Sequence, residues 1–300
     1  MFVFIILPLV LLSKPWRTLP EDYEKSLYDV KLYKPRMKSV KHVRILLHGP
    51  VGTGKSTFIN SVNSLFQRRI TCGAMSDGAN WTSFTQKYTT YKIEKSKKES
   101  YNFVFNDTKG LEEPTNSGID VEDIKCVLKG HVRDGYKFDS ENPISEDDDL
   151  YNANPTLNDK VHVVVFVIPA DKISLISETM RTKMRNIRLA ASEEGIPQLI
   201  VLTKVDEYCP KVKEDITHVY RSRSLKEQVD KASQLLGLPP NCIFLVKNYH
   251  TEMAPNDNMN ALILFALRQM INLGEDYLNS LPEPEEDEPE VEPEDEPEKE

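Results

Sequence analysis

Short apolar runs separated by polar stretches are the main pattern along this chain of 300 residues. The run at 161–168 (VHVVVFVI) holds the most β-branched residues, and its lack of alternation is typical of a strand buried on both faces. Further runs of this kind predict strands at 42–48, 85–93, 101–106, 198–203 and 242–246.

Between these runs, apolar residues recur with helical spacing. From residue 55 onward, Phe58, Val62 and Leu65 fall on one face of a 3.6-residue period. Further helices are expected at 23–32, 119–128, 173–194, 224–236 and 258–273. Because strands and helices alternate, we predict an α/β fold with a mainly parallel sheet of about six strands, flanked by helices and joined by right-handed crossovers.

Composition divides the chain into four parts. A hydrophobic content of 39% is enough for one large domain or two small ones. We expect an apolar segment at 1–13, a polar lead-in arm at 14–40, the α/β domain at 41–278 and a tail at 279–300. Within the domain, residues 131–160 form a long polar insertion, and a loop of that length is usually functional or mobile.

The formal net charge of −9 comes from the tail. Residues 282–300 hold twelve Asp and Glu residues and one Lys, so the rest of the chain carries +2. A proline-spaced acidic run cannot bury apolar surface, so we expect it to be disordered, with a solubilising role or, alternatively, as an acidic interaction tail. Elsewhere Lys and Arg are interspersed with acids, so we expect no nucleic-acid partner.

The cysteines and the first residues bear on location. The four cysteines are far apart and form no C-x-x-C pair, which favours reduced thiols and a cytoplasmic protein. Residues 1–12 are uncharged and almost wholly apolar, but they are too few to span a bilayer as a helix. They lack the basic region of a secretory signal. A shallow anchor with weak membrane association and a segment packed on the domain both stay open.

The strongest chemical signal is the segment 49–56 (GPVGTGKS), which has the spacing G-x-x-x-x-G-K-[ST] of a phosphate-binding loop. It lies between a predicted strand and a predicted helix, as a P-loop NTPase requires. Glycines let several backbone N–H groups turn toward one anion, Lys55 adds a positive charge for the β- and γ-phosphates, and the Ser56 hydroxyl can ligate Mg²⁺. We assign the following residues to nucleotide phosphates: Gly49, Gly52, Thr53, Gly54, Lys55, Ser56 and Thr57.

A D-x-x-G sequence follows the strand predicted at 101–106. Asp107 can hold Mg²⁺ through water, and the amide of Gly110 can reach a γ-phosphate; the alternative is an ordinary turn. A threonine that contacts Mg²⁺ should lie between Ser56 and Asp107. We choose Thr85 as this metal residue. The alternatives are Thr82, Thr89 and Thr90.

The base is indicated by Thr203-Lys204-Val205-Asp206, directly after another predicted strand. The Asp206 carboxylate can accept two hydrogen bonds from guanine, and adenine offers neither donor there. Lys204 would lie along the base. The alternative is a surface Lys-Asp pair. Lys247, in a loop after the last predicted strand, is a weaker candidate for contacting the edge of the base.

Five segments together resemble the vertebrate interferon-induced protein 44 family of GTPase-like proteins. They are GPVGTGKSTFINSVNSLF, DTKGLE, KVHVVVFVI, GIPQLIVLTKVDEYCP and LVKNYHTE, in this order. The resemblance implies a Ras-like G domain, a cytoplasmic location, interferon induction and an antiviral or immune role. It also implies these nucleotide contacts: Gly49, Gly54, Lys55, Ser56, Asp107, Gly110, Thr203, Lys204 and Asp206. Longer members carry an N-terminal TLDc-type domain, which we expect this chain to lack.

Binding of GTP or GDP with Mg²⁺ is predicted more directly than catalysis. Many GTPases orient the attacking water with a glutamine after D-x-x-G, whereas this chain has Leu111. We therefore expect a slow GTPase or a switch in which 80–90 and 110–117 order around the γ-phosphate and contact a second copy or another protein. The alternatives are a GTP-stabilised scaffold that does not cycle and a P-loop kinase or ATPase.

Overall fold

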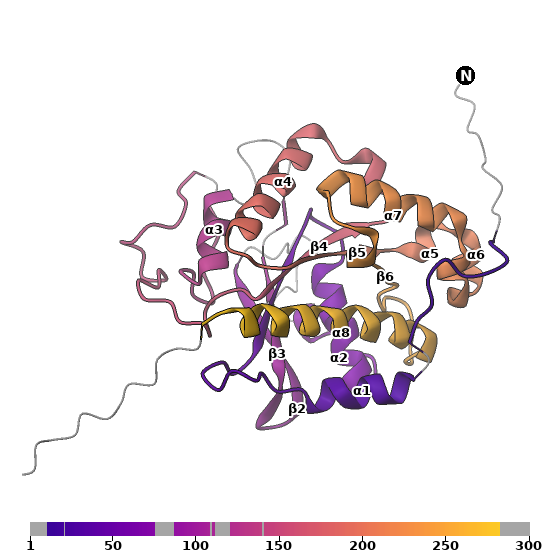
Figure 1. Cartoon of the computed structure of the whole chain (residues 1–300), viewed down its shortest axis with the longest axis horizontal. Coiled ribbons are helices and arrows are strands. Elements are labelled where there is room, and N and C mark those ends of the chain that lie inside the picture. Colours follow the sequence, from indigo (N-terminus) through magenta and orange to yellow (C-terminus); the bar gives the residue numbers. More distant parts are fainter. Residues whose placement is uncertain are drawn as a thin grey trace, which may run out of the picture.

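The computed structural model describes residues 11–20, 22–75, 87–108, 110–111, 121–139 and 141–282. Within these residues the strands form one six-stranded sheet with the order β2-β3-β1-β4-β5-β6 (Figure 1). The strands are β1 (Val43–His48), β2 (Thr89–Ser96), β3 (Glu99–Asp107), β4 (Val163–Pro169), β5 (Gln198–Thr203) and β6 (Ile243–Leu245).

The sheet is parallel except for its edge strand β2, which runs antiparallel to β3. β2 and β3 are joined by a tight turn, and a hairpin connection of this kind makes neighbouring strands antiparallel. The other neighbours are joined through helices, which keeps them parallel. The mixed α/β architecture and the mainly parallel six-stranded sheet predicted for a Ras-like G domain are confirmed.

Helices cover both faces of the sheet. One face carries α1 (Tyr23–Leu32), α2 (Lys55–Gln67) and α8 (Asp257–Ser280), and the other carries α3 (Val121–Lys129), α4 (Glu178–Glu193) and α7 (Arg223–Leu236) (Figure 1). Two short helices, α5 (Val205–Tyr208) and α6 (Pro210–Glu214), follow β5. Every residue of β4 is buried, as its β-branched sequence predicts, because helices pack on both of its faces.

The lead-in arm packs on the domain. Leu27 and Val30 of α1 are buried in the same apolar cluster as Val43 of β1. Farther upstream, Leu12 donates a backbone hydrogen bond of 2.7 Å to Arg221. No helix among the described residues is both long enough and apolar enough to cross a membrane. The tail from residue 283 lies outside the described part of the chain.

Three elements depart from their predicted boundaries by more than two residues. β2 spans Thr89–Ser96, whereas the strand was predicted at 85–93, of which 85 and 86 lie outside the described residues. The helix predicted from residue 173 is a single 3₁₀ turn, Ile173–Leu175, followed by α4, because the Ser177 side chain accepts a hydrogen bond from the Met180 N–H and caps a new helix there. α8 continues to Ser280 instead of ending at residue 273.

The long insertion is packed rather than separate. Its described residues form no helix or named strand, yet Val132, Tyr136 and Phe138 are buried in the cluster that also holds α3 and α4 side chains. Asp123 of α3 accepts a 2.8 Å hydrogen bond from the backbone of Ile144. These contacts attach the polar stretch to the body of the domain.

Candidate nucleotide-binding site

Four loops meet at the carboxyl edge of the sheet. The 49–56 loop connects β1 to α2, and the other three follow β3, β5 and β6. Because parallel strands end at the same edge, segments that are far apart in sequence become neighbours there. The structure thus brings the phosphate loop, the D-x-x-G segment, the T-K-x-D segment and Lys247 to one edge.

The phosphate loop lies close against the sheet. A side-chain carbon at Gly49 would lie 2.3 Å from the carbonyl oxygen of Val167 in β4, so only glycine allows this approach. Gly52 and Gly54 both have positive φ, and Gly54 directly precedes the first residue of α2. The loop therefore opens into the N-terminus of a helix, where unpaired N–H groups and the helix dipole favour an anion.

Lys55 is buried inside this loop. Its side-chain nitrogen Nζ donates hydrogen bonds of 3.1 Å to the carbonyl oxygens of Gly49 and Pro50. Burial lowers the pKa of the Lys55 ammonium, and the Asp107 carboxylate opposes that shift. Two main-chain acceptors thus hold a buried cation at the place where the motif requires a phosphate ligand.

Ser56 and Asp107 form the pair that can hold a magnesium ion. The Ser56 hydroxyl donates a hydrogen bond of 2.6 Å to Oδ2 of Asp107, so one oxygen from α2 and one from β3 lie side by side. Within the described residues, no group of three or more His, Cys, Asp or Glu side chains could bind a metal ion. A hydroxyl and one carboxylate still fit Mg²⁺, which usually keeps several waters and takes further oxygens from phosphates.

The D-x-x-G segment is attached directly to the phosphate loop. The Leu111 N–H donates to the Gly49 carbonyl at 3.1 Å, and the Val51 N–H donates to the Leu111 carbonyl at 3.2 Å. The Leu111 side chain is only 1% exposed and packs in the core with Phe166 and Leu46. The Leu111 side chain has no polar atom, and it also points into the core.

The T-K-x-D segment is also bonded to the 49–56 loop. The Thr203 hydroxyl donates a 2.7 Å hydrogen bond to the Thr53 carbonyl. Lys204 has a positive φ of 56° and caps α5, whose first turn contains Asp206. This turn places Lys204 and Asp206 directly after the carboxyl end of β5, next to the residue that is bonded to the 49–56 loop.

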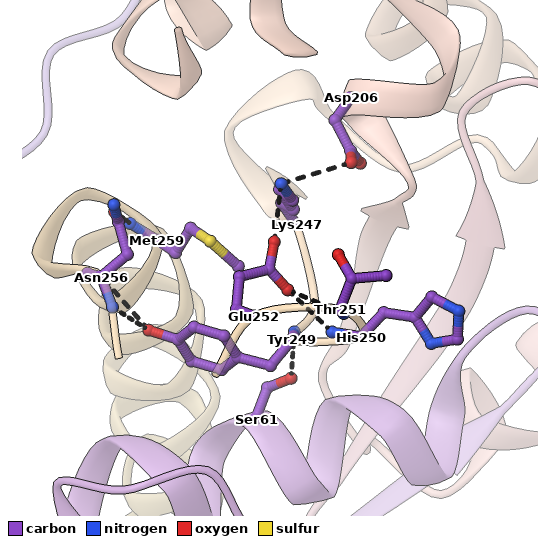
Figure 2. A network of polar contacts seen from close by, with 9 residues as sticks. All are labelled: Ser61, Asp206, Lys247, Tyr249, His250, Thr251, Glu252, Asn256 and Met259. Carbon is purple, nitrogen blue, oxygen red and sulfur yellow. Dashed lines mark hydrogen bonds and ion pairs between the residues drawn. The ribbon is translucent and has the colours of Figure 1, made fainter. Parts of the chain in front are cut away.

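Asp206 has an intramolecular partner. Its Oδ2 lies 3.5 Å from Nζ of Lys247, which lies 2.9 Å from Oε1 of Glu252 (Figure 2). Burial lowers the pKa of the Lys247 ammonium, but the hydrogen bond to Glu252 and the charge of Asp206 outweigh it, and the net shift is upward. Burial raises the pKa of Glu252, yet hydrogen bonds from the His250 N–H and from Lys247 bring it down to about 2. Lys247 and Glu252 are therefore both charged at neutral pH.

Sequence comparison identifies the relatives of this chain. It is 34% identical over 263 residues to human "Interferon-induced protein 44-like" and 35% identical over 257 residues to mouse "Interferon-induced protein 44". The aligned residues make up 87% and 85% of this chain, respectively. The chain belongs to the interferon-induced protein 44 family. It spans 58% and 60% of the length of these two relatives.

Other comparisons add less to the family assignment. No protein-family model matches the chain. A solved structure described as a "probable GTP-binding protein engB" matches with a TM-score of 0.44 and 12% identity, over 78% of this chain and 98% of that one. Similarity at this level does not bear on the function of this member of the interferon-induced protein 44 family.

Two of the predicted site residues need separate comment. Thr85 lies outside the described residues, so its contact with Mg²⁺ stays a prediction. Thr57 follows Ser56 in the first turn of α2, and its carbonyl accepts a hydrogen bond of 2.8 Å from the Ser61 hydroxyl. Thr57 is half-buried at the start of the helix, next to the phosphate loop.

Three further residues near this edge were not among the predicted site residues. Glu252 pairs with Lys247, and an acid five residues after a loop lysine was the available signal. Asn248 donates a 3.1 Å hydrogen bond from Nδ2 to the Gly54 carbonyl, which only the fold reveals. His48 ends β1 fully buried, and neither ring nitrogen has a hydrogen-bond partner among the described residues.

Proposed function

We propose that this chain binds guanine nucleotides together with Mg²⁺. The observation that carries the proposal is the connection of the three loops. Ser56 contacts Asp107 at 2.6 Å, and Thr203 contacts the Thr53 carbonyl at 2.7 Å. Phosphate-binding, metal-binding and base-reading groups therefore belong to one connected site, and an incidental glycine turn does not account for it.

Each part of the chain has a distinct task in this proposal. The N–H groups of the 49–56 loop and the Lys55 ammonium bind the phosphates, and the Gly110 N–H faces the γ-phosphate. Ser56 and Asp107 would hold Mg²⁺, which neutralises phosphate charge when bound. Asp206 accepts hydrogen bonds from guanine, the aliphatic stem of Lys204 lies along the base, and the loop of Lys247 lies at the edge of the base.

Slow hydrolysis of GTP, or a switch with little hydrolysis, is the catalytic part of the proposal. Leu111 lies where many GTPases place a water-orienting glutamine, and its side chain is buried in the core. Turnover would then need a group supplied by a second copy or another protein. Segments 80–90 and 110–117 would order around the γ-phosphate and contact that partner.

The biological setting is proposed from the relatives. Their names state interferon induction. We infer that this chain acts in an interferon-induced immune or antiviral response in the cytoplasm. The free thiols of Cys72, Cys126, Cys209 and Cys242 are compatible with a reducing compartment.

The second candidate is a scaffold that binds GTP without cycling. The buried Leu111 favours it, because no polar side chain from this position can align a water molecule. Multiple turnovers of GTP with Mg²⁺ would exclude the scaffold. Equal hydrogen-exchange protection of 80–90 and 110–117 with GTP and with GDP would exclude the switch.

The decisive experiment is calorimetric titration with GTP, GDP and ATP, each with Mg²⁺ and with EDTA. The wild-type chain should bind GTP more tightly than ATP, and EDTA should weaken the binding of GTP. Lys55→Ala should lower affinity for all three nucleotides by about 10- to 100-fold, because a charged hydrogen-bond donor is lost. Lys211→Ala is the matched control, since it also removes a lysine charge, here one that forms an exposed ion pair with Glu214.

Base choice needs its own variant. Asp206→Asn should lower GTP affinity by at least about tenfold and leave ATP affinity unchanged, because only guanine uses the carboxylate. Tight ATP binding that GTP cannot displace would contradict the guanine assignment and favour an ATPase or kinase.

A further inference from the structure

Glu252 occupies a defined position beside the base-reading carboxylate. Its Oε2 accepts backbone hydrogen bonds from His250 at 2.9 Å and from Thr251 at 3.1 Å, while Oε1 receives the Lys247 ammonium (Figure 2). One oxygen of the Glu252 side chain thus accepts bonds from the backbone of its own loop, and the other is left for Lys247. The side chains of Lys247 and Glu252 are 22% and 20% exposed, so water screens the pair only in part.

The loop that presents this pair is anchored on two helices. The Tyr249 N–H donates a hydrogen bond of 2.9 Å to the Ser61 hydroxyl of α2 (Figure 2). The Tyr249 hydroxyl donates a hydrogen bond of 2.8 Å to Oδ1 of Asn260 in α8. The Asn256 N–H in turn donates 2.7 Å to that hydroxyl. Because the backbone around Lys247 is held in place, the position of its ammonium depends mainly on which carboxylate attracts it.

Two carboxylates share that ammonium. It lies 2.9 Å from Glu252 and 3.5 Å from Asp206, so the contact with Glu252 is the shorter one. Guanine requires the Asp206 carboxylate to accept its N1–H and 2-amino groups. An ammonium fully seated on Asp206 would compete with the base for the same oxygens.

We propose that Glu252 is a specificity-determining positioning residue, which draws the Lys247 ammonium away from Asp206 and leaves that carboxylate available to guanine. The inference rests on the proposed guanine-nucleotide function and deepens it. Asp206 touches the base, and Glu252 acts only through Lys247. Adenine makes no use of the Asp206 carboxylate, so the effect is confined to guanine nucleotides.

Substitutions of Glu252 and of Lys247 should change GTP affinity in opposite directions. Glu252→Gln keeps an oxygen for the His250 and Thr251 amides but loses the charge that attracts Lys247. The ammonium then moves fully onto Asp206, and GTP affinity falls by about tenfold, the size expected for one charged hydrogen bond. Lys247→Met keeps the apolar stem and removes the competitor, so GTP affinity rises by about threefold or more.

The test is calorimetric titration of GTP and ATP into wild type, both single variants and the double variant Glu252→Gln/Lys247→Met. The double variant should bind GTP as tightly as Lys247→Met, because Glu252 has no effect once the ammonium is gone. ATP affinity should be the same in all four proteins. Glu214→Gln is the matched control, since Glu214 also lies 2.9 Å from a lysine, Lys211, in a surface pair. Thermal unfolding of each variant monitors the fold.

Several outcomes would overturn the inference. Wild-type GTP affinity in Glu252→Gln would remove the role of Glu252. A double variant as weak as Glu252→Gln would show that the substitution damages the loop, as would an equal loss of ATP binding. After any of these outcomes, the proposed function still holds if the wild-type chain binds GTP more tightly than ATP. A wild type without that preference refutes the proposed function first, and this inference with it.

Discussion

The Thr203 hydroxyl donates a hydrogen bond of 2.7 Å to the main-chain carbonyl of Thr53. This contact joins the end of β5, where the T-K-x-D segment begins, to the middle of the 49–56 loop. Both residues are almost wholly buried, so water cannot replace the bond. The two parts of the candidate site are thereby held in a fixed relation.

Thr203→Val should destabilise the nucleotide-free protein. Valine has nearly the same shape, but it leaves the buried Thr53 carbonyl without its donor, which costs about 1–3 kcal/mol of the free energy of unfolding. Urea denaturation measures this change. Thr203→Ser keeps the hydroxyl and should lose less. Equal stability of Thr203→Val and wild type would show that this bond contributes nothing.

Leu111→Gln should lower stability without raising GTP turnover. The side chain at this position is buried in the core, so the glutamine amide would be placed among apolar residues rather than beside a water molecule. An unpaired buried amide costs about 1–3 kcal/mol, and the loss of leucine packing adds to it. Urea denaturation and a steady-state GTPase assay measure the two effects.

Leu111→Met is the control for that substitution, because a swap of similar volume usually costs less than about 1.5 kcal/mol. An increase in turnover in Leu111→Gln at unchanged stability would mean that the side chain can reach the nucleotide. The absence of a glutamine at position 111 would then be enough to explain slow hydrolysis.

Gly110→Ala should weaken nucleotide binding. A side-chain carbon there would lie 2.6 Å from Cγ2 of Val51 and 2.7 Å from its backbone nitrogen, so the D-x-x-G segment and the phosphate loop would have to separate. We expect GTP affinity to fall by about tenfold or more, as for loss of a main-chain donor to the γ-phosphate. Gly73→Ala is the matched control, because a carbon there meets nothing within 4 Å. Equal affinities of the two variants would contradict the close contact.

His48 should make the stability depend on pH. Burial, followed by the nearby Lys55 charge, lowers the His48 pKa from 6.5 to about 3. Between pH 6.5 and about 3, the His48 imidazole is therefore protonated in the unfolded chain and neutral in the folded chain. The contribution of neutral His48 to the free energy of unfolding is fully present above the unfolded pKa of 6.5. It is lost progressively as the pH falls toward 3. Between pH 7 and 5 it amounts to about 2 kcal/mol.

The comparison with His48→Leu isolates this contribution. Urea denaturation at several pH values should show a smaller loss of stability in the variant than in wild type between pH 7 and 5. His162, whose pKa burial also lowers, is present in both proteins and cancels from the difference. Parallel pH profiles would show that His48 does not titrate on unfolding.

Local sequence was sufficient for most of the fold. The uniformly apolar run around β4 predicted a strand buried on both faces, and the G-x-x-x-x-G-K-S spacing predicted a turn from a strand into a helix. These features depend on neighbouring residues in the chain. Boundaries were less reliable, because the break before α4 depends on one capping hydrogen bond from Ser177.

The sequence by itself determined the α/β class, the phosphate loop and the identity of the residues that follow each strand. Only the tertiary structure decided which way Leu111 points and which partners Lys247 has. The reason is physical: motif spacing places a residue at the end of an element, but the direction of its side chain depends on packing and charges from distant segments. Asp206 and Glu252 lie 3.5 and 2.9 Å from the same Lys247 ammonium, and no local pattern in the sequence predicts that the two carboxylates share it.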